Sequence, residues 1–362
     1  MSFYLKCILL VIFFFGKHSE SQNIRHPKYK AAIFEAHRII DSLKQKQNIP
    51  GLDIALSIND TIVWSEAFGY ANIEHLVPVI TGKTRFRIAS VSKPLTTVAI
   101  GKLMERGALN PDTLIQTYVP YFPQKKYPIT VRQIAGHIAG IRSYKGNEFL
   151  LAKKYNSVKA GLEIFKNDSL QFKPSTAYLY SSYGFNLLSA AVEGASGISF
   201  LEFMEKELFE PLQMQSTIAD KNENIIPNRT TFYKTDDTGE LRHTPYVDNS
   251  YKWASGGFLS TTHDLIKFGN AMINENLISD KTIKQLTKSQ KLSNGKKTGY
   301  GMGWGVINKG KLNGFGHDGA AVGGITRFAI FPKEKLVVIA VSNSSNVDYG
   351  NTIESIVALF ID

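Results

Sequence analysis

Two segments of the chain place a serine three residues before a lysine, the spacing at which one helical turn brings an amine beside a hydroxyl. The segment 90–93 reads SVSK and continues into apolar residues, whereas the segment 293–296 reads SNGK and lies in a polar turn. An ammonium group that loses its hydration has its pKa lowered from about 10.4, and the neutral amine is a base toward a nearby hydroxyl. Only the first segment offers an apolar setting, so Ser90 and Lys93 are the candidate nucleophile and base. The alternative is a serine that caps an ordinary helix with a surface lysine.

A helix must hold both of these groups on one face. Apolar residues recur at helical spacing from Ser90 to Arg106, and Gly107 follows as a typical helix terminator. The free amides and the positive potential at the start of such a helix would stabilise an oxyanion on an attacked carbonyl. The sequence therefore predicts acyl-transfer chemistry at the N-terminal end of this helix.

Longer segments resemble the conserved boxes of the serine β-lactamase and penicillin-binding-protein-like superfamily, in the family order. The first box is 87–109 (RIASVSKPLTTVAIGKLMERGAL) and the second is 172–197 (FKPSTAYLYSSYGFNLLSAAVEGASG). Between them, 128–141 (PITVRQIAGHIAGI) is similar to the loop that follows the first helices. The segment 244–272 (TPYVDNSYKWASGGFLSTTHDLIKFGNAM) is most similar to the mitochondrial β-lactamase-like serine protease branch and its bacterial relatives. The likeness covers about residues 30–345.

The resemblance implies a role for each residue that matches a box. Ser90 would be the nucleophile and Lys93 its general base. Tyr180, in the second box, would pass protons among the serine, the lysine and the leaving group. Two neighbouring cations would favour the deprotonated form of this phenol. The backbone amides of Ser90 and Ala320 would be the two oxyanion donors.

Two triplets compete for the third box, which must lead along an edge strand beside the nucleophile. The literal KTG at 297–299 lies in a lysine-rich turn, and the YGMGWGV after it resembles the segment that precedes the third box in the family. The HDG at 317–319 is followed by a glycine stretch and a predicted hairpin, so we assign the box there. His317 would then donate a hydrogen bond near the nucleophile and titrate near neutral pH. Gly319 would border the substrate site.

Two residues depart from the family pattern, and both concern substrate binding. Ser182 stands where the family usually has asparagine, and a hydroxyl cannot reproduce the donor and acceptor of a carboxamide. Asp318 stands where a threonine or serine usually helps to bind a substrate carboxylate. If its side chain faces the site, its negative charge would repel such a carboxylate. These departures weaken the case for efficient penicillin hydrolysis and leave acyl transfer intact.

Other catalytic motifs are absent or stand in the wrong context. The stretch 314–319 (GFGHDG) spells GxGxxG but leads into a strand, whereas a dinucleotide site needs a helix there. The chain has no GxSxG elbow and no HExxH motif, and its eight histidines are scattered. We therefore expect neither a metal ion nor an organic cofactor.

The periodic segments predict an α+β fold. A helix is expected over 28–47, a half-buried strand over 52–58 that turns into a hairpin, and two further strands within 325–343. Strands at both ends of the chain with helices between them predict one antiparallel sheet, built from the N- and C-terminal segments and flanked by helices. A mostly helical subdomain would be inserted at about 122–250. This is the β-lactamase/transpeptidase-like architecture.

The N-terminal segment has the features of a secretory signal. Lys6 precedes an apolar run too short to span a bilayer stably, and Ser19 and Ser21 have the small-x-small spacing of a cleavage site. We expect 1–21 to direct export to the periplasm or the extracellular space and to be removed, leaving one catalytic domain, 22–362. An uncleaved segment would instead anchor the chain in the membrane. The only cysteine lies inside this segment, so no disulfide is expected.

The composition of the chain limits the classes of partner that it is expected to bind. With 362 residues, 43% of them hydrophobic, the chain can bury a large core. Its formal charge of +11 is spread along the sequence without a basic tract that carries interleaved aromatics, which argues against nucleic acid. A basic surface fits general association with an anionic envelope.

These observations predict a serine hydrolase that cleaves an amide or ester bond through an acyl-serine intermediate. A small peptide is the first choice of substrate, which makes the chain a peptidase. A short-chain ester is second, and β-lactam hydrolysis is third. The competing class is a catalytically inactive binding or scaffold protein of the same fold, which Ser182 and Asp318 keep open. The oligomeric state is left open.

Overall fold

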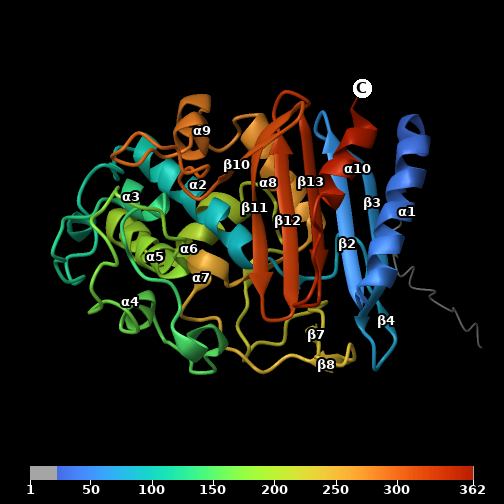
Figure 1. The fold of residues 1–362 in the computed structure, drawn as a ribbon, viewed down its shortest axis with the longest axis horizontal. Helices are drawn as coiled ribbons and strands as arrows, with labels where there is room; N and C mark the ends of the chain where they lie inside the picture. Colours follow the sequence, from blue (N-terminus) through green and yellow to red (C-terminus); the bar gives the residue numbers. More distant parts are fainter. Residues whose placement is uncertain (1–22, 362) are drawn as a thin grey trace, which may run out of the picture.

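The computed structural model describes residues 23–361, and its central feature is one antiparallel sheet (Figure 1). The strand order is β1-β3-β2-β13-β12-β11-β10, and β4 pairs with β3 at one end. Short strands form a three-stranded sheet, β5-β9-β6, and a β7-β8 pair. The bounds of the strands are β1 Ile24–Arg25, β2 Gly51–Ile58, β3 Thr61–Asn72, β4 Val77–Pro78, β5 Phe86–Arg87, β6 Ile218–Ala219, β7 Tyr233–Thr235, β8 Leu241–His243, β9 Phe258–Ser260, β10 Gly305–Lys309, β11 Leu312–Ala321, β12 Gly324–Phe331 and β13 Leu336–Ser342.

The two ends of the chain meet in the middle of the sheet. β13 pairs antiparallel with β2, which places Leu52 opposite Ser342. The β2–β3 turn has positive φ angles at Asn59 and Asp60, which these side chains tolerate. Every residue of β2 and β13 is buried, so β2 is not the half-buried strand that its alternation predicts. Layers on both faces bury its polar residues as well. The predicted α+β class, with one sheet from both ends of the chain, is confirmed.

Helices cover both faces of the sheet (Figure 1). α1 and α10 pack on one face over a core that includes Trp64, and α8 packs on the other face against β2 and β13. The second, larger core continues from α8 into a region where α2, α5 and α7 pack together. The helices are α1 Lys30–Lys46, α2 Ser92–Glu105, α3 Val131–Ala135, α4 Val158–Leu162, α5 Ser182–Ser196, α6 Phe200–Met204, α7 Trp253–Gly256, α8 Thr262–Ile273, α9 Asp280–Thr287 and α10 Thr352–Phe360.

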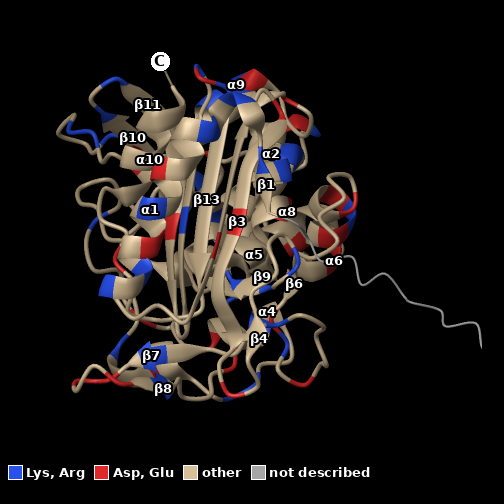
Figure 2. Ribbon diagram, turned by 90° about the vertical axis from the view of Figure 1, so that its right-hand side faces the viewer, with Lys and Arg blue, Asp and Glu red and all other residues tan. Residues whose placement is uncertain are grey.

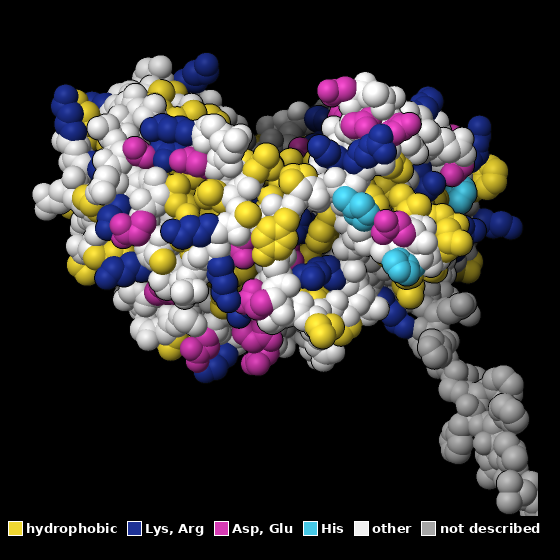
Figure 3. Space-filling view, turned by 90° about the horizontal axis from the view of Figure 1, so that it is seen from below, with side chains coloured by type: hydrophobic (Ala, Val, Ile, Leu, Met, Phe, Trp, Pro, Cys, Tyr) yellow, Lys and Arg dark blue, Asp and Glu magenta, His cyan; other side chains and the backbone are white. Residues whose placement is uncertain are grey.

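Positive and negative side chains are interspersed on the surface. Figure 2 shows Lys and Arg alternating with Asp and Glu around the helices and the β7–β8 hairpin. The lower end of the molecule has the same mixture, with hydrophobic side chains between the charges (Figure 3). No single helix of the described residues is long and apolar enough to cross a membrane. One pair bent by 78°, Ser182–Ser196 with Phe200–Phe209, meets the same length and composition test.

A buried carboxyl in β2 makes the stability of this fold depend on pH. Asp53 is completely buried, and its oxygens accept hydrogen bonds of 2.7 Å from the hydroxyls of Thr81 and Thr262. The amide of Gly82 donates a third bond of 3.0 Å. Burial outweighs these bonds and raises the pKa of Asp53 from 3.8 to about 6.

The stability that protonated Asp53 contributes is complete below its unfolded pKa and is lost as the pH rises through about 6. At about 1.4 kcal/mol per pK unit, the loss amounts to about 3 kcal/mol. We expect Asp53→Asn, which stays neutral, to remove this component of the pH dependence. Urea unfolding of both proteins at about pH 4 and about pH 7 measures it. A free-energy difference between the two proteins that does not change with pH would contradict the prediction.

Candidate active site

Ser90 lies in a 3₁₀ turn, Ala89–Val91, and α2 begins only at Ser92, so the helix starts two residues later than predicted. Ala89 has φ +49°, a left-handed conformation that costs an L-residue about 1–2 kcal/mol. The hydroxyl of Ser92 donates to the carbonyl oxygen of Ala89 at 2.7 Å and supports this turn. The turn presents Ser90 at the end of α2 and packs against β11. Backbone strain of this kind is common where a side chain must be aimed at a site.

The amine of Lys93 is completely buried among oxygen atoms. Its Nζ lies 3.0 Å from the Oγ of Ser90, 2.8 Å from the carbonyl oxygen of Ser255 and 3.4 Å from the Oγ of Ser182. Burial lowers the pKa of Lys93 well below its usual 10.5, and the charge of Lys252 lowers it further. Both influences favour the neutral amine, as the apolar sequence context predicts.

The three oxygens determine how that neutral amine is oriented. A neutral amine has two N–H groups and one lone pair. The carbonyl oxygen of Ser255 only accepts hydrogen bonds, so it takes one N–H group. The hydroxyl of Ser182 can take the second N–H group, which leaves the lone pair for the hydroxyl of Ser90. Ser182 thus contributes an acceptor to Lys93 from the first residue of α5.

Tyr180 lies just before α5 and contacts Ser90 from another side. Its ring centroid is 4.8 Å from the Nζ of Lys93, and its hydroxyl interacts with the hydroxyl of Ser90. Burial is the largest influence on this phenol and raises its pKa well above the usual 10. The expectation that neighbouring cations favour the phenolate is therefore wrong. Loss of solvent favours the protonated phenol.

β11 runs past Ser90, and one edge of the strand is open there. β10 pairs with it only as far as Gly316, and no other strand of the described residues pairs with that edge beyond this point. Alternate residues of an antiparallel strand point their amides to the same side, so Ala320 shares the side of Gly316 and faces the open edge. A Cβ on Gly319 would lie 2.4 Å from the carbonyl oxygen of Ile88 and 3.2 Å from the amide nitrogen of Ser90. Only glycine lets β11 approach so closely.

His317 is placed beside the site, but its two nitrogens are already engaged. Nδ1 donates to the carbonyl oxygen of Asp318 at 2.5 Å, so Nε2 accepts from the hydroxyl of Tyr300 at 2.8 Å. Burial and repulsion by Lys93 lower the pKa of His317 to about 3. The ring lies 6.1 Å from that of Tyr180. The expectations that His317 titrates near neutral pH and donates toward the nucleophile are both wrong.

The side chain of Asp318 lies on the α10 face of the sheet. It forms an ion pair with Arg327, the residue directly opposite on β12, and Arg327 also pairs with Glu354 of α10. Gly319, the next residue, faces Ser90 from the other side of the strand. The anionic charge of Asp318 is therefore balanced by a neighbouring cation, which weakens the repulsion of a substrate carboxylate that the sequence suggests.

The literal KTG triplet does not take the place beside the serine, but the residue after it reaches the site. Residues 297–299 belong to a turn after α9, and Gly299 has φ +77°. Tyr300 follows, is buried, and contacts His317. Sequence reasoning missed Tyr300, and its position directly after a box-like triplet is the one signal that could have found it. It also missed the carbonyl oxygen of Ser255, because a backbone atom leaves no residue-type signature.

A cavity of about 450 Å³ opens over these groups. Lys93 and Ser182 lie beneath it in the protein interior. The structure thus places all eight predicted residues around one cavity. Its lining comprises Ser90, Tyr180, His317, Asp318, Gly319, Ala320, three residues of β12 (Ile325, Thr326, Arg327) and the segment 347–350.

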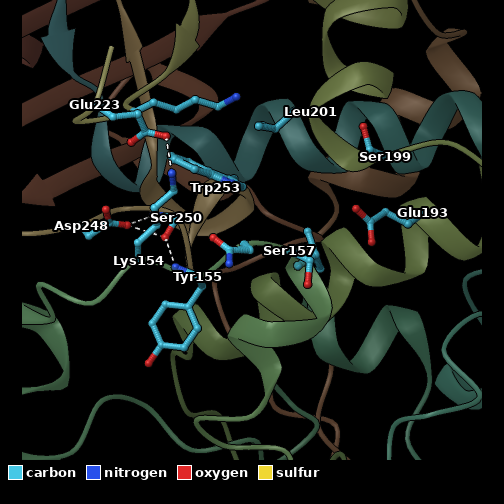
Figure 4. Close-up of a pocket in the computed structure, with 13 residues that line it drawn as sticks. Lys154, Tyr155, Ser157, Glu193, Ser199, Leu201, Glu223, Asp248, Ser250 and Trp253 are labelled. Carbon is cyan, nitrogen blue, oxygen red and sulfur yellow. Dashed lines mark hydrogen bonds and ion pairs between the residues drawn. The ribbon is translucent and has the colours of Figure 1, made fainter.

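A second cavity, of about 390 Å³, lies among α4, α5, α6 and the segment 248–253 and contains none of the predicted residues. Figure 4 shows Lys154 paired with Glu223 across it at 2.8 Å, and Asp248 bonded to Ser250. Asp248 and Trp253, from the segment 244–272, line this second cavity. Within residues 23–361, no group of three His, Cys, Asp or Glu side chains could hold a metal ion.

The fold and the site define the class. A serine, a buried lysine and a buried tyrosine lie where an antiparallel sheet meets a helical region, as in the β-lactamase/transpeptidase-like fold. The family model described as Beta-lactamase matches residues 36–358. The chain belongs to the beta-lactamase family, within the superfamily of serine β-lactamases and penicillin-binding proteins.

Curated relatives and solved structures agree with this assignment. The chain is 33% identical to the serine beta-lactamase-like protein LACTB, mitochondrial, of Homo sapiens over 84% of this chain and 73% of that protein. It is 27% identical to penicillin-binding protein 4* of Bacillus subtilis (strain 168), over 84% and 70%. The octameric penicillin-binding protein homologue from Pyrococcus abyssi has the same fold, with a TM-score of 0.78 at 24% identity over 91% and 77%. A D-stereospecific amidohydrolase from Streptomyces sp. has it too, with a TM-score of 0.76 at 18% identity over 90% and 97%.

Proposed function

We propose that the protein is a serine hydrolase that cleaves a peptide amide bond through an acyl-Ser90 intermediate. One observation carries the proposal: the completely buried amine of Lys93 lies 3.0 Å from the Oγ of Ser90, and its lone pair is free to take the hydroxyl proton. An amine whose pKa is lowered by burial is a competent base at neutral pH. A purely structural role does not explain this burial, because burying an amine without a carboxylate partner costs free energy.

The geometry supports a specific order of proton transfers in acylation. The Oγ of Ser90 attacks the substrate carbonyl carbon as its proton passes to the Nζ of Lys93. The negative charge that develops on the carbonyl oxygen is met by the amides of Ser90 and Ala320. The bond from carbon to the leaving group then breaks, and the protonated hydroxyl of Tyr180 gives its proton to the departing nitrogen or oxygen.

The same groups serve deacylation in reverse order. The Tyr180 phenolate recovers a proton from the Lys93 ammonium, with the Ser90 oxygen lying between them. The neutral pair then accepts a proton from a water molecule that attacks the acyl carbon, and Ser90 leaves as a restored hydroxyl. No residue beyond this pair is needed as the base.

A short peptide is the preferred substrate class in this proposal. The open edge of β11 offers backbone groups to an extended chain, which a peptide satisfies better than a compact bicyclic lactam. Ser182 supports the same preference, because its single hydroxyl is used toward Lys93. Short-chain esters are the second candidate, since the same steps cleave them with an easier leaving group.

A fluorophosphonate probe and a substrate panel test the proposal. We expect covalent labelling, with mass spectrometry placing the adduct on Ser90, and turnover of D- or L-peptide amides and p-nitrophenyl esters. A penicillin serves as the third arm and is expected to be the poorest substrate. Absence of labelling and of turnover across about pH 6–9 would favour an inactive scaffold of this fold.

We also propose that residues 1–21, which lie outside the described residues, direct export to the periplasm or the extracellular space. The Homo sapiens relative is named as mitochondrial, so the test must separate export from mitochondrial import. N-terminal sequencing and fractionation of a C-terminally tagged full chain are suitable. A chain that begins at Gln22 in the exported fraction supports the proposal. An intact N-terminus in the membrane fraction supports an anchored form, and recovery with mitochondria contradicts export.

A further inference from the structure

His137 contacts the chain on both sides of Tyr180, although it does not line the cavity. Its backbone oxygen accepts from the amide of Leu179 at 2.9 Å, and its ring Nδ1 accepts from the amide of Ser181 at 3.1 Å. These two bonds grip the chain on either side of Tyr180. The imidazole also packs against the ring of Tyr180, with centroids 4.3 Å apart. His137 thus contacts the backbone on both sides of residue 180 through its carbonyl oxygen and its ring, and its ring also packs on the ring of Tyr180.

The local backbone is bent to allow this grip. His137 has φ +59°, a left-handed conformation that few non-glycine residues adopt, although asparagine, aspartate and histidine adopt it more often than others. It is only 2% exposed, and its ring also lies 4.8 Å from that of Tyr300, the partner of His317. Strain of about 1–3 kcal/mol persists only where the surroundings hold it. The ring of His137 therefore joins the two tyrosines of the site.

The bonds also determine the protonation state of the imidazole. Since the Ser181 amide donates to Nδ1, that nitrogen carries a lone pair and the ring proton is on Nε2. Nε2 is buried and has no hydrogen-bond partner among the described residues. A second proton would set two N–H groups against each other at Nδ1. In agreement, burial lowers the pKa of His137 well below 6.5.

We propose that His137 is a positioning residue that aims the Tyr180 hydroxyl at the leaving group, by gripping residues 179 and 181 and packing on the ring between them. The inference rests on the proposed acyl-serine function. It predicts a dependence on the leaving group that a general packing role would not produce. In the acylation step, misplacing the Tyr180 hydroxyl matters only where the leaving group needs a proton. An alkyl ester or peptide amide needs one, whereas p-nitrophenolate leaves without it.

Two substitutions at position 137 separate the acceptor from the bulk of the side chain. His137→Phe keeps a ring but removes the acceptor for the Ser181 amide. His137→Asn places an oxygen near the position of Nδ1 and tolerates positive φ. We expect His137→Phe to lower kcat/KM, which reports acylation, at least about 10-fold with the alkyl ester or peptide amide and less than about 3-fold with the p-nitrophenyl ester. His137→Asn should restore most of the loss.

A double variant tests whether the effect passes through the phenol. Tyr180→Phe should show the same dependence on the leaving group, and His137→Phe added to it should cause no further loss. If His137→Phe does not fold by circular dichroism, His137→Gln replaces it, because its amide reaches the Nε2 position instead. Equal losses with both leaving groups, or additive losses in the double variant, would overturn the inference. Full activity in Ser90→Ala would instead overturn the proposed function.

Discussion

Replacing Ser90 with alanine is expected to lower kcat/KM at least about 10³-fold and to abolish fluorophosphonate labelling. The reason is that no second nucleophile is available beside the lowered-pKa lysine. Among residues 23–361, the hydroxyls bonded to Lys93 are those of Ser90 and Ser182, and Ser182 lies beneath the cavity floor at 8% exposure. Steady-state kinetics with a p-nitrophenyl ester and intact-protein mass spectrometry measure the two effects.

The chain supplies its own matched control for this substitution. Ser293 has the same spacing to a following lysine but is exposed in a turn, and its amide bonds to the carbonyl oxygen of Ser175. Ser293→Ala should leave both kcat/KM and labelling unchanged. Persistent labelling of Ser90→Ala would mean that the nucleophile is another residue. Loss of activity in the control would mean that the assay reports on folding.

Lys93→Met should cause the second large effect, a fall in kcat of about 10²–10⁴-fold, because the general base is lost while the volume is kept. The thermal midpoint should stay the same or rise, since the buried amine is costly to desolvate and methionine is not. Lys93→Arg should be inactive as well, because a guanidinium does not release its proton at accessible pH. Lys296→Met, in the second serine–lysine segment, is the control.

The pH dependence of the wild type distinguishes this base from other candidates. Activity should rise with pH through the lowered pKa of Lys93 and persist until the raised pKa of the Tyr180 phenol, above 10, is reached. His317 does not set the acid limb near neutrality, because its pKa is about 3. His317→Gln should therefore keep the shape of the profile. An acid limb near pH 6.5 that disappears in this variant would contradict the assignment.

Sequence reasoning was most reliable where the chemistry is written in neighbouring residues. The Ser90–Lys93 pair depends on one turn of chain and an apolar context, both visible as letters, and the structure gives 3.0 Å between the two groups. The choice of HDG over the literal KTG also agrees with the placement of β11. That choice followed from what comes after each triplet, namely a hairpin in one case and a glycine-rich segment in the other.

Protonation states were predicted least well from the sequence, because they depend on burial by segments that are distant in the chain. The sequence suggests a phenolate at Tyr180 and a titrating His317, but desolvation reverses both expectations. The same limit applies to Ser255, Tyr300 and the grip of His137 on residues 179 and 181. Each of these contacts joins segments more than ten residues apart in the chain, and no periodicity reports such pairs.

The order of residues along the chain by itself determined the family, the sheet built from both ends, and the pairing of Ser90 with Lys93. Local spacing and alternation carry that information because helices and strands repeat within a few residues. Only the tertiary structure decided which groups are charged, which face of β11 each side chain takes, and how the phenol is aimed. Those properties come from the loss of water and from contacts between distant segments, and they exist only once the chain has folded.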